Sequence, residues 1–89
     1  DNNVYAFDIR SGRVLWRYET GDQVASNPVV AKSGVYFGSV DGHIYCLDVT
    51  NGKLRWKFKT DGPVISSPSV MDDVVYVGSA DHNLYALPA

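Results

Sequence analysis

Acidic residues that recur at 40-residue intervals are the first candidates for chemistry in this sequence. The recurring set is Asp1, Asp41 and Asp81, with His43 and His82 beside the last two. Carboxylate and imidazole groups ligate metals, and hard oxygen ligands suit Ca²⁺. Equivalent residues of successive repeats, however, lie too far apart to share one ion, and Asp is a common turn former. We therefore expect turns at these positions and no metal site.

Nucleophilic and acid–base catalysis has little support either. Cys46 aligns with Ala6 and Ala86 at a shift of 40, so this position favours a small, buried side chain and an inert thiol. Asp8 and Asp48 are expected to accept hydrogen bonds from backbone amides of the following turn. The sequence contains no nucleophile elbow and no phosphate-binding glycine loop. We predict no catalytic site and no enzyme activity.

The composition argues against two classes of partner. The 89 residues carry a formal net charge of −2, and 45% are hydrophobic and 20% charged, which is typical of a globular chain. The longest basic cluster occupies every second position of one segment: Lys53, Arg55, Lys57 and Lys59. This spacing indicates one solvated strand face rather than a nucleic-acid footprint. No apolar run reaches the roughly 20 residues that span a bilayer, so we predict neither nucleic-acid binding nor membrane insertion.

The start of the chain suggests how it arose. It begins at Asp1 rather than Met, and no signal peptide is evident, so we expect an excised, processed or designed segment. The single cysteine excludes an intramolecular disulfide and leaves the compartment undecided.

An internal repeat organises the whole sequence. Shifting it by 40 positions pairs residues 1–49 with residues 41–89 without a gap, and seventeen of these 49 pairs are identical. A fixed period of this length indicates a row of equal structural units. The identical pairs include Tyr5/Tyr45, Asp8/Asp48, Gly12/Gly52, Trp16/Trp56, Thr20/Thr60, Ser26/Ser66, Pro28/Pro68, Tyr36/Tyr76, Gly38/Gly78 and Ser39/Ser79.

Each repeat contains four short strand-like segments separated by turn residues. In the complete copy these strands are predicted over 27–31, 35–39, 43–48 and 53–59, with turns at 32–34, 40–42 and 50–52. Short β-branched and aromatic runs bounded by Gly, Asn and Asp are typical of antiparallel hairpins. Four such strands in 40 residues make one β-propeller blade. The predicted fold is all-β, with blades of four antiparallel strands, about two blades per chain and no helix.

Counting these strands divides the chain among three blades. Residues 1–20 supply the last two strands of one blade, residues 21–60 a complete blade, and residues 61–89 the first three strands of another. Strands two and three carry large apolar groups on both faces, so we expect them to be covered on both sides. The fourth strand alternates apolar with basic residues, which predicts one buried and one solvated face at the outer rim. Its apolar set is Leu54, Trp56 and Phe58.

A longer pattern recurs in register within the repeats. Residues 6–16 read AFDIRSGRVLW and residues 46–56 read CLDVTNGKLRW. Both resemble the tryptophan-docking motif of quinoprotein (PQQ-like) β-propellers, roughly Ala-x-Asp-x-x-Thr-Gly-Lys-x-x-Trp, and the resemblance covers essentially the whole chain. The Trp-Asp signature of WD40 propellers, whose blades have a similar length, is absent.

The resemblance implies a structural role for the motif. In the family, the Trp lies near the rim and stacks onto the motif of the neighbouring repeat, the Ala leaves room, and the Gly allows the turn. The corresponding positions are Ala6, Gly12, Trp16, Cys46, Gly52 and Trp56. Two departures stand out: Cys46 replaces the motif Ala, and Pro88 stands where a third copy would have Asp.

The resemblance also raises the question of a cofactor. In quinoprotein dehydrogenases the quinone is held with Ca²⁺ and a catalytic Asp, and the groups that sandwich it include a disulfide between adjacent cysteines. Cys46 alone cannot form that disulfide. PQQ and Ca²⁺ follow only by family analogy, and we predict no cofactor, with Trp16 and Trp56 as packing residues.

Two blades cannot close a ring, so we expect assembly. We predict a non-catalytic scaffold for protein partners that joins head to tail into a closed ring of seven or eight blades, with four chains if there are eight. Residues 1–9 duplicate residues 81–89, so one copy must be displaced. The alternative is an excised fragment of a quinoprotein dehydrogenase or of a propeller sensor domain. The family is mostly extracytoplasmic, which does not assign a compartment to this chain.

Overall fold

The protein consists of short β-strands that pair as antiparallel hairpins along the chain. The computed structural model describes residues 2–8, 10–24 and 26–89. Within these ranges the regular structure consists entirely of β-strands, and every sheet is antiparallel. The strands are β1 (Asn3–Phe7), β2 (Val14–Glu19), β3 (Val29–Ala31), β4 (Gly34–Gly38), β5 (His43–Asp48), β6 (Leu54–Lys59), β7 (Ser69–Met71), β8 (Val74–Gly78) and β9 (Leu84–Pro88).

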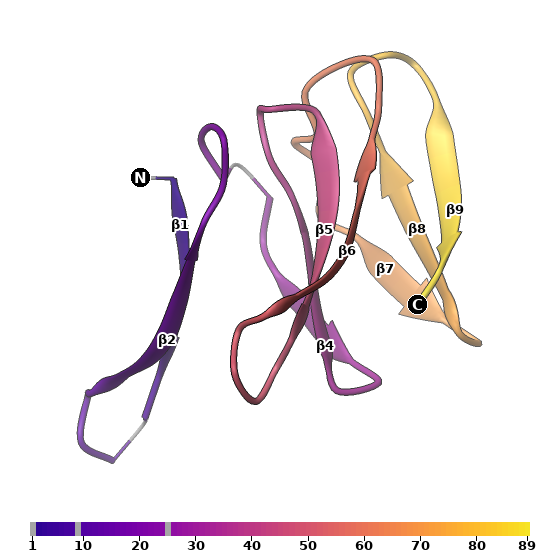
Figure 1. The fold of residues 1–89 in the computed structure, drawn as a ribbon. Coiled ribbons are helices and arrows are strands. Elements are labelled where there is room, and N and C mark those ends of the chain that lie inside the picture. The colour runs from indigo at the N-terminus through magenta and orange to yellow at the C-terminus, as the bar shows by residue number, and fades with distance from the viewer. Residues whose placement is uncertain (1, 9, 25) are drawn as a thin grey trace.

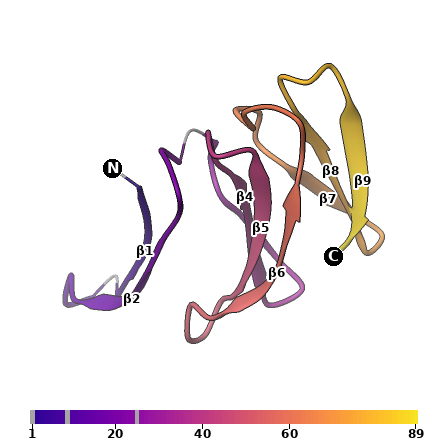
Figure 2. The same cartoon turned by 45° about the horizontal axis from the view of Figure 1, so that its top comes forward.

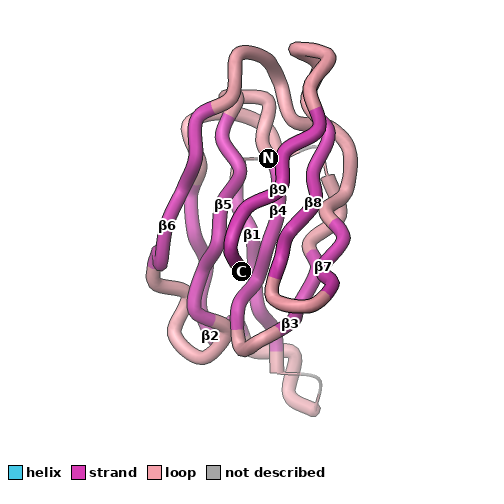
Figure 3. The backbone as a smooth tube through the Cα atoms, turned by 90° about the vertical axis from the view of Figure 1, so that its right-hand side faces the viewer, coloured by secondary structure: helices cyan, strands magenta, loops and turns pink. Residues whose placement is uncertain are grey.

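The strands form three separate sheets in chain order. They are a two-stranded sheet β1-β2, a four-stranded sheet β3-β4-β5-β6 and a three-stranded sheet β7-β8-β9. The sheets lie side by side in that order (Figures 1 and 2). Viewed from the β9 side, they stand one behind another (Figure 3). The arrangement confirms the predicted all-β fold of antiparallel propeller blades.

Successive side chains of the middle sheet point to opposite faces, and each face is buried against a different neighbouring sheet. Tyr36 of β4 belongs to a core shared with the third sheet, where it is buried with Val64, Val75 and other residues. Phe37, the next residue, belongs to a second core shared with Val4 of the first sheet. Successive strand residues point to opposite faces, so β4 and β5 are buried on both sides, as predicted from their composition.

The strand boundaries differ slightly from those predicted. The first strand of the middle sheet is shorter, because β3 begins at Val29 rather than at residue 27. The turn after it contains only Lys32 and Ser33, with φ angles of 52° and 53°, while Gly34 already belongs to β4. Positive φ at both central residues is required by a two-residue type I′ hairpin. Asp72 and Asp73 repeat this conformation, with φ angles of 49° and 67°.

One face of β6 is less buried than the alternating sequence predicts. Leu54 and Phe58 are each 40% exposed, and Trp56 is only partly buried. The third sheet ends at β9, so no strand beside β9 covers this face of β6. The prediction of a buried face was therefore wrong for Leu54 and Phe58. The basic residues on the opposite face of β6, in contrast, are exposed as predicted.

Candidate functional site: the contact between repeats

Trp16 joins the first sheet to the second. It lies on β2 opposite Ala6 of β1, and its indole Nε1 donates a hydrogen bond of 3.0 Å to the backbone oxygen of Val49. Its ring lies on Gly52, because a Cβ added there would be 2.5 Å from ring atoms Cδ2 and Cε3. The rim strand of one repeat thus covers the β5–β6 turn of the next.

The turn that Trp16 covers is held by Asp48. The Asp48 amide donates to the Lys53 oxygen and the Gly52 amide donates to the Asp48 oxygen, both at 2.8 Å. The Asp48 carboxylate accepts the Thr50 amide at 2.8 Å. Hydrogen bonds from the hydroxyl and amide of Thr50 outweigh partial desolvation and hold the pKa of Asp48 below its usual value. Asp48 therefore acts on backbone amides, as predicted, and its amide and carbonyl groups close the turn.

The first motif copy repeats this turn but leaves it uncovered. Asp8 makes the same backbone bonds, with its amide donating to the Arg13 oxygen and its oxygen accepting the Gly12 amide, each at 2.8 Å. Gly12 has a φ of 73°, identical to that of Gly52. A Cβ added at Gly12 would meet nothing within 4 Å. The surface that Trp16 occupies on the second copy is therefore open on the first.

Trp56 is the counterpart of Trp16 without a turn beneath it. It lies opposite Cys46 and contacts the Tyr36 ring, with centroids 6.2 Å apart. On its other side is an open, largely apolar groove of about 330 Å³. The groove runs between β6 and β9, and it is lined by Trp56, Lys57, Phe58, Leu87, Pro88 and Ala89. It lies where a strand beside β9 would run.

Cys46 is a packing residue in this geometry. Its side chain is fully buried, and burial raises the pKa of its thiol. A raised pKa lowers the thiolate fraction, and the thiolate is the reactive form. The thiol therefore fills the space across from Trp56 that a motif Ala would occupy.

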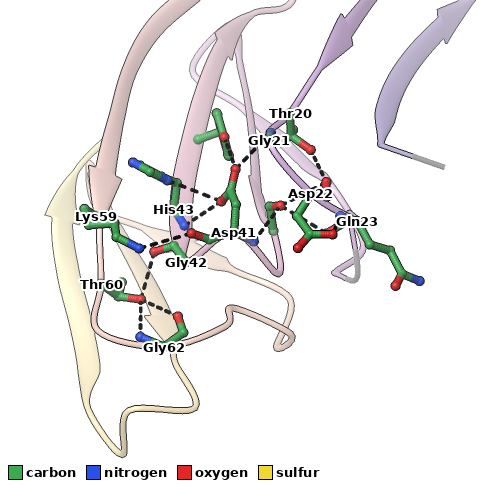
Figure 4. A network of polar contacts seen from close by, with 12 residues as sticks. Thr20, Gly21, Asp22, Gln23, Asp41, Gly42, His43, Lys59, Thr60 and Gly62 are labelled. Carbon is green, nitrogen blue, oxygen red and sulfur yellow. Dashed lines mark hydrogen bonds and ion pairs between the residues drawn. The ribbon is translucent and has the colours of Figure 1, made fainter.

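The recurring Asp residues join each sheet to the chain segment before it. Asp41 accepts hydrogen bonds from the Tyr45 hydroxyl, the His43 amide at 2.8 Å and the Gly21 amide at 3.1 Å (Figure 4). Asp81 repeats the pattern with Tyr85, Asn83 and Asp61. These carboxylates are occupied by donors, and in the described ranges no cluster of three potential metal ligands forms. Asp1, the third member of the set, lies outside the described residues.

We expect the Asp41 contacts to make stability depend on acid pH. Burial opposes ionisation of Asp41, but bonds from Tyr45, His43 and Gly21 outweigh it and lower its pKa. A lowered pKa stabilises the fold above the unfolded value of about 3.9, and this contribution is lost as pH falls below it. Asp41→Asn should therefore cost about 2 kcal/mol at pH 7 and progressively less below about pH 4, as measured by urea unfolding.

Asp81→Asn is the matched control for that measurement. Asp81 has the same kinds of donors but is more solvated, so its loss should be smaller at every pH. Equal losses for both variants, or a loss in Asp41→Asn that is independent of pH, would contradict the assignment.

Three residue contacts central to this site were not predicted individually. They are the Val49 oxygen that accepts the Trp16 bond, the Asp41–Tyr45–Gly21 cluster, and the close approach of Gly38 to Val64. The sequence held a signal for the second, since an Asp-x-x-x-Tyr spacing recurs at 41–45 and 81–85. It held one for the third as well, since the pairs Gly38/Gly78 and Val24/Val64 are both identical across repeats.

Comparison with known proteins agrees with this geometry. A family described as outer membrane protein assembly factor BamB, of the PQQ-like repeat type, matches residues 1–89. The chain belongs to this family. No curated protein sequence matches it significantly.

Three solved structures share the fold. BamB from Moraxella catarrhalis is 26% identical with a TM-score of 0.83, over 98% of this chain and 28% of that protein. The computationally designed Ika4 protein has a TM-score of 0.86 at 21% identity, over 99% of this chain and 55% of its own. Quinohemoprotein alcohol dehydrogenase ADHIIG from Pseudomonas putida HK5 is 26% identical with a TM-score of 0.79, over 88% of this chain and 14% of its own.

The PQQ-like chain is thus short beside its relatives. It spans little more than a quarter of BamB and about half of Ika4. In the ranges that the structure describes, there is no helix long and apolar enough to cross a membrane.

Proposed function

We propose that this PQQ-like chain is a non-catalytic assembly scaffold whose copies join head to tail by completing each other's blades. The observation that carries the proposal is the apolar groove between β6 and β9. In the middle sheet the equivalent place beside β5 is filled by β6. The strand that fits the groove is therefore a fourth strand of the same repeat, and β2 (Val14–Glu19) of a second copy is such a strand.

The two open motif surfaces match in register. Trp16 reaches Gly52, which lies 36 positions further along, so Trp56 needs a glycine turn at the equivalent of position 92. If residues 1–20 of a second copy follow on as the repeat dictates, Gly12 of that copy takes position 92. Trp56 then covers the uncovered Gly12 turn, and both halves of the motif gain a partner. We assign Ala6, Gly12, Trp16, Cys46, Gly52 and Trp56 this docking role.

The repeat length sets the size of the assembly. Each added copy contributes two 40-residue repeats, so a ring of eight blades contains four copies. A head-to-tail contact between unlike surfaces closes only when the rotation per subunit divides a full circle. The ring would cover both apolar ends of the chain, and its loops would present repeated surfaces to a protein partner.

The test is the absolute mass in solution, measured by light scattering behind a sizing column over a range of concentrations. A single species near four chains is the expected result. Gly12→Trp blocks the open turn, where nothing lies within 4 Å of an added Cβ, so it should prevent assembly while costing the separate chain only the backbone strain of a positive φ, about 1 kcal/mol. A wild-type chain that stays monomeric throughout would overturn the proposal.

A second candidate is a fragment of a quinoprotein dehydrogenase or of a propeller sensor domain. The observation that favours it is the match to 14% of the length of ADHIIG. In that case the functional residues lie on blades outside this sequence. Absorbance titration with PQQ and Ca²⁺ separates the two, because saturable binding supports the dehydrogenase origin, and the scaffold requires none.

A further inference from the structure

Two segments of this chain compete for one position in a completed blade. β1 (Asn3–Phe7) and β9 (Leu84–Pro88) are both third strands of a repeat, and residues 1–9 align with residues 81–89. Resting on the proposed function, we infer that blade completion is a strand exchange, in which β1 of the second copy displaces β9 and pairs with β8. In the separate chain β9 pairs with β8 and occupies the position that β1 of the second copy takes after assembly.

Pro88 makes β9 unfit to hold a fourth strand. It occupies the position of Asp48, whose amide donates to Lys53 and whose carboxylate caps the following turn. Proline has no amide hydrogen to donate, and it is a common means of blocking a strand edge. The edge of β9 that faces the groove therefore lacks the bond with which β5 begins its pairing to β6.

The β1–β2 hairpin has every feature that β9 lacks. Asp8 donates its amide to the Arg13 oxygen at 2.8 Å, and its carboxylate accepts the Arg10 amide at 2.8 Å. The pairing of β1 with β2 shifts register between Ala6 and Phe7, at the same place in the repeat where β5–β6 shifts. If β2 left β1 to pair with β9, all of these bonds would break and the bond at Pro88 could not form. Exchange keeps the hairpin intact.

Burial favours the same strand. Val4 of β1 is 7% exposed and packs with Val35, Phe37 and other residues of its own middle sheet. Leu84, at the equivalent position of β9, is 74% exposed. Displacing β1 would pull Val4 out of a formed core. Displacing β9 removes Leu84, which is already in water, and the partly buried Tyr85 and Leu87, whose places Tyr5 and Phe7 of the incoming strand would take. The cost of the two exchanges therefore differs in favour of keeping β1.

On the side that faces β6, β1 of the second copy can replace the contacts that β9 makes. The Tyr85 ring packs on Phe58, with centroids 5.6 Å apart. Tyr5 is the equivalent residue of β1, so an incoming β1 offers the same ring to Phe58. Ala6 likewise replaces Ala86. The groove side of the third sheet loses no aromatic contact in the exchange.

The distribution of charge favours a second copy of this chain as the partner that binds at the third sheet. Residues 61–89 contain four Asp and neither Lys nor Arg, while the hairpin segment 10–17 contains Arg10, Arg13 and Arg17 and no acid. Opposite charges steer association and suppress pairing of like ends. The first hairpin as a whole is close to neutral, because Asp8 and Glu19 offset two of its three Arg. The acidic third sheet is thus complementary to the basic residues of 10–17, and two third sheets repel.

The exchange can be tested on the full chain by hydrogen exchange of the alternate β9 amides that face β8, which the bond from the Ala89 amide to the Asp73 oxygen places at Tyr85, Leu87 and Ala89. In the monomer the β8–β9 ladder should protect these amides. In the assembled species they should exchange about as fast as an unstructured peptide, while those of β1 stay protected. Protected β9 amides in a formed ring would overturn the exchange but leave the proposed function standing. A chain that never assembles would contradict the proposed function itself, on which the exchange rests.

Two variants give opposite expectations. Deletion of residues 81–89 removes the competitor and should lower the concentration of half-assembly by about tenfold, equivalent to roughly 1.4 kcal/mol. Pro88→Asp restores the missing amide and carboxylate to β9 and should raise that concentration. If the truncated chain does not fold alone, the Pro88→Asp result still decides: unchanged or tighter assembly would contradict the exchange.

Discussion

Gly52→Ala is expected to destabilise the PQQ-like chain by about 3 kcal/mol, as measured by urea unfolding at a concentration where it is monomeric. Two effects add. Gly52 has a φ of 73°, a conformation that costs an L-residue about 1–2 kcal/mol. The new methyl group would lie 2.5 Å from the Trp16 ring, so the indole must move and its 3.0 Å bond to Val49 is lost.

Gly12→Ala is the control that isolates the tryptophan contribution. Gly12 has the same φ of 73°, but nothing lies within 4 Å of an added Cβ. Its substitution should cost only the backbone term, about 1 kcal/mol. If the two losses are equal in the monomer, Trp16 contributes nothing through Gly52 and the docking interpretation fails.

The same control becomes informative when the chain assembles. If Trp56 of one copy covers Gly12 of the next, the loss for Gly12→Ala should grow with protein concentration toward that for Gly52→Ala. The loss for Gly52→Ala should stay constant, because its partner is in the same chain. One pair of variants thus reports on docking within a chain and between chains.

The local structure could be predicted because each element depends on neighbouring residues. A Gly at a fixed distance after Asp predicts the turns at Gly12 and Gly52, and both adopt the required positive φ. Apolar residues on both faces of β4 and β5 predict burial between two sheets, which the two cores confirm. The repeat adds a check, because an interpretation that fits one copy must fit the other.

The contacts between repeats depend on information that a period alone does not supply. A shift of 40 shows that Trp16 and Trp56 are equivalent, but not which of them lies on Gly52. The direction is set by how one sheet is offset against the next, and the family resemblance indicated only that the Trp stacks onto the motif of a neighbouring repeat. The exposure of Leu54 and Phe58 has a related cause, since it depends on which strands of the next repeat are present rather than on the alternation within β6.

A second glycine shows how closely the repeats approach at a point away from the tryptophans. Gly38 lies at the end of β4 and is buried. A Cβ added there would lie 2.1 Å from Cγ1 and 3.1 Å from the backbone oxygen of Val64, a fully buried residue at the start of the third repeat. The Gly38 amide and oxygen also bond the Ser26 hydroxyl, at 2.7 and 3.3 Å. The residue therefore cannot shift without breaking these bonds.

Gly38→Ala should accordingly cost about 3 kcal/mol through overpacking, as measured by urea unfolding. Gly78→Ala is the matched control, because its added Cβ would meet only the Ser66 hydroxyl, at 3.3 Å, and its loss should stay within about 1 kcal/mol. Combining Gly38→Ala with Val64→Ala removes the methyl group at 2.1 Å but leaves the Val64 Cβ at 2.7 Å, so the double variant should be more stable than the sum of the single losses predicts while part of the strain remains. Strict additivity would place the strain elsewhere than between these two side chains. Recovery would show that the second and third repeats are locked together by the absence of a single methyl group.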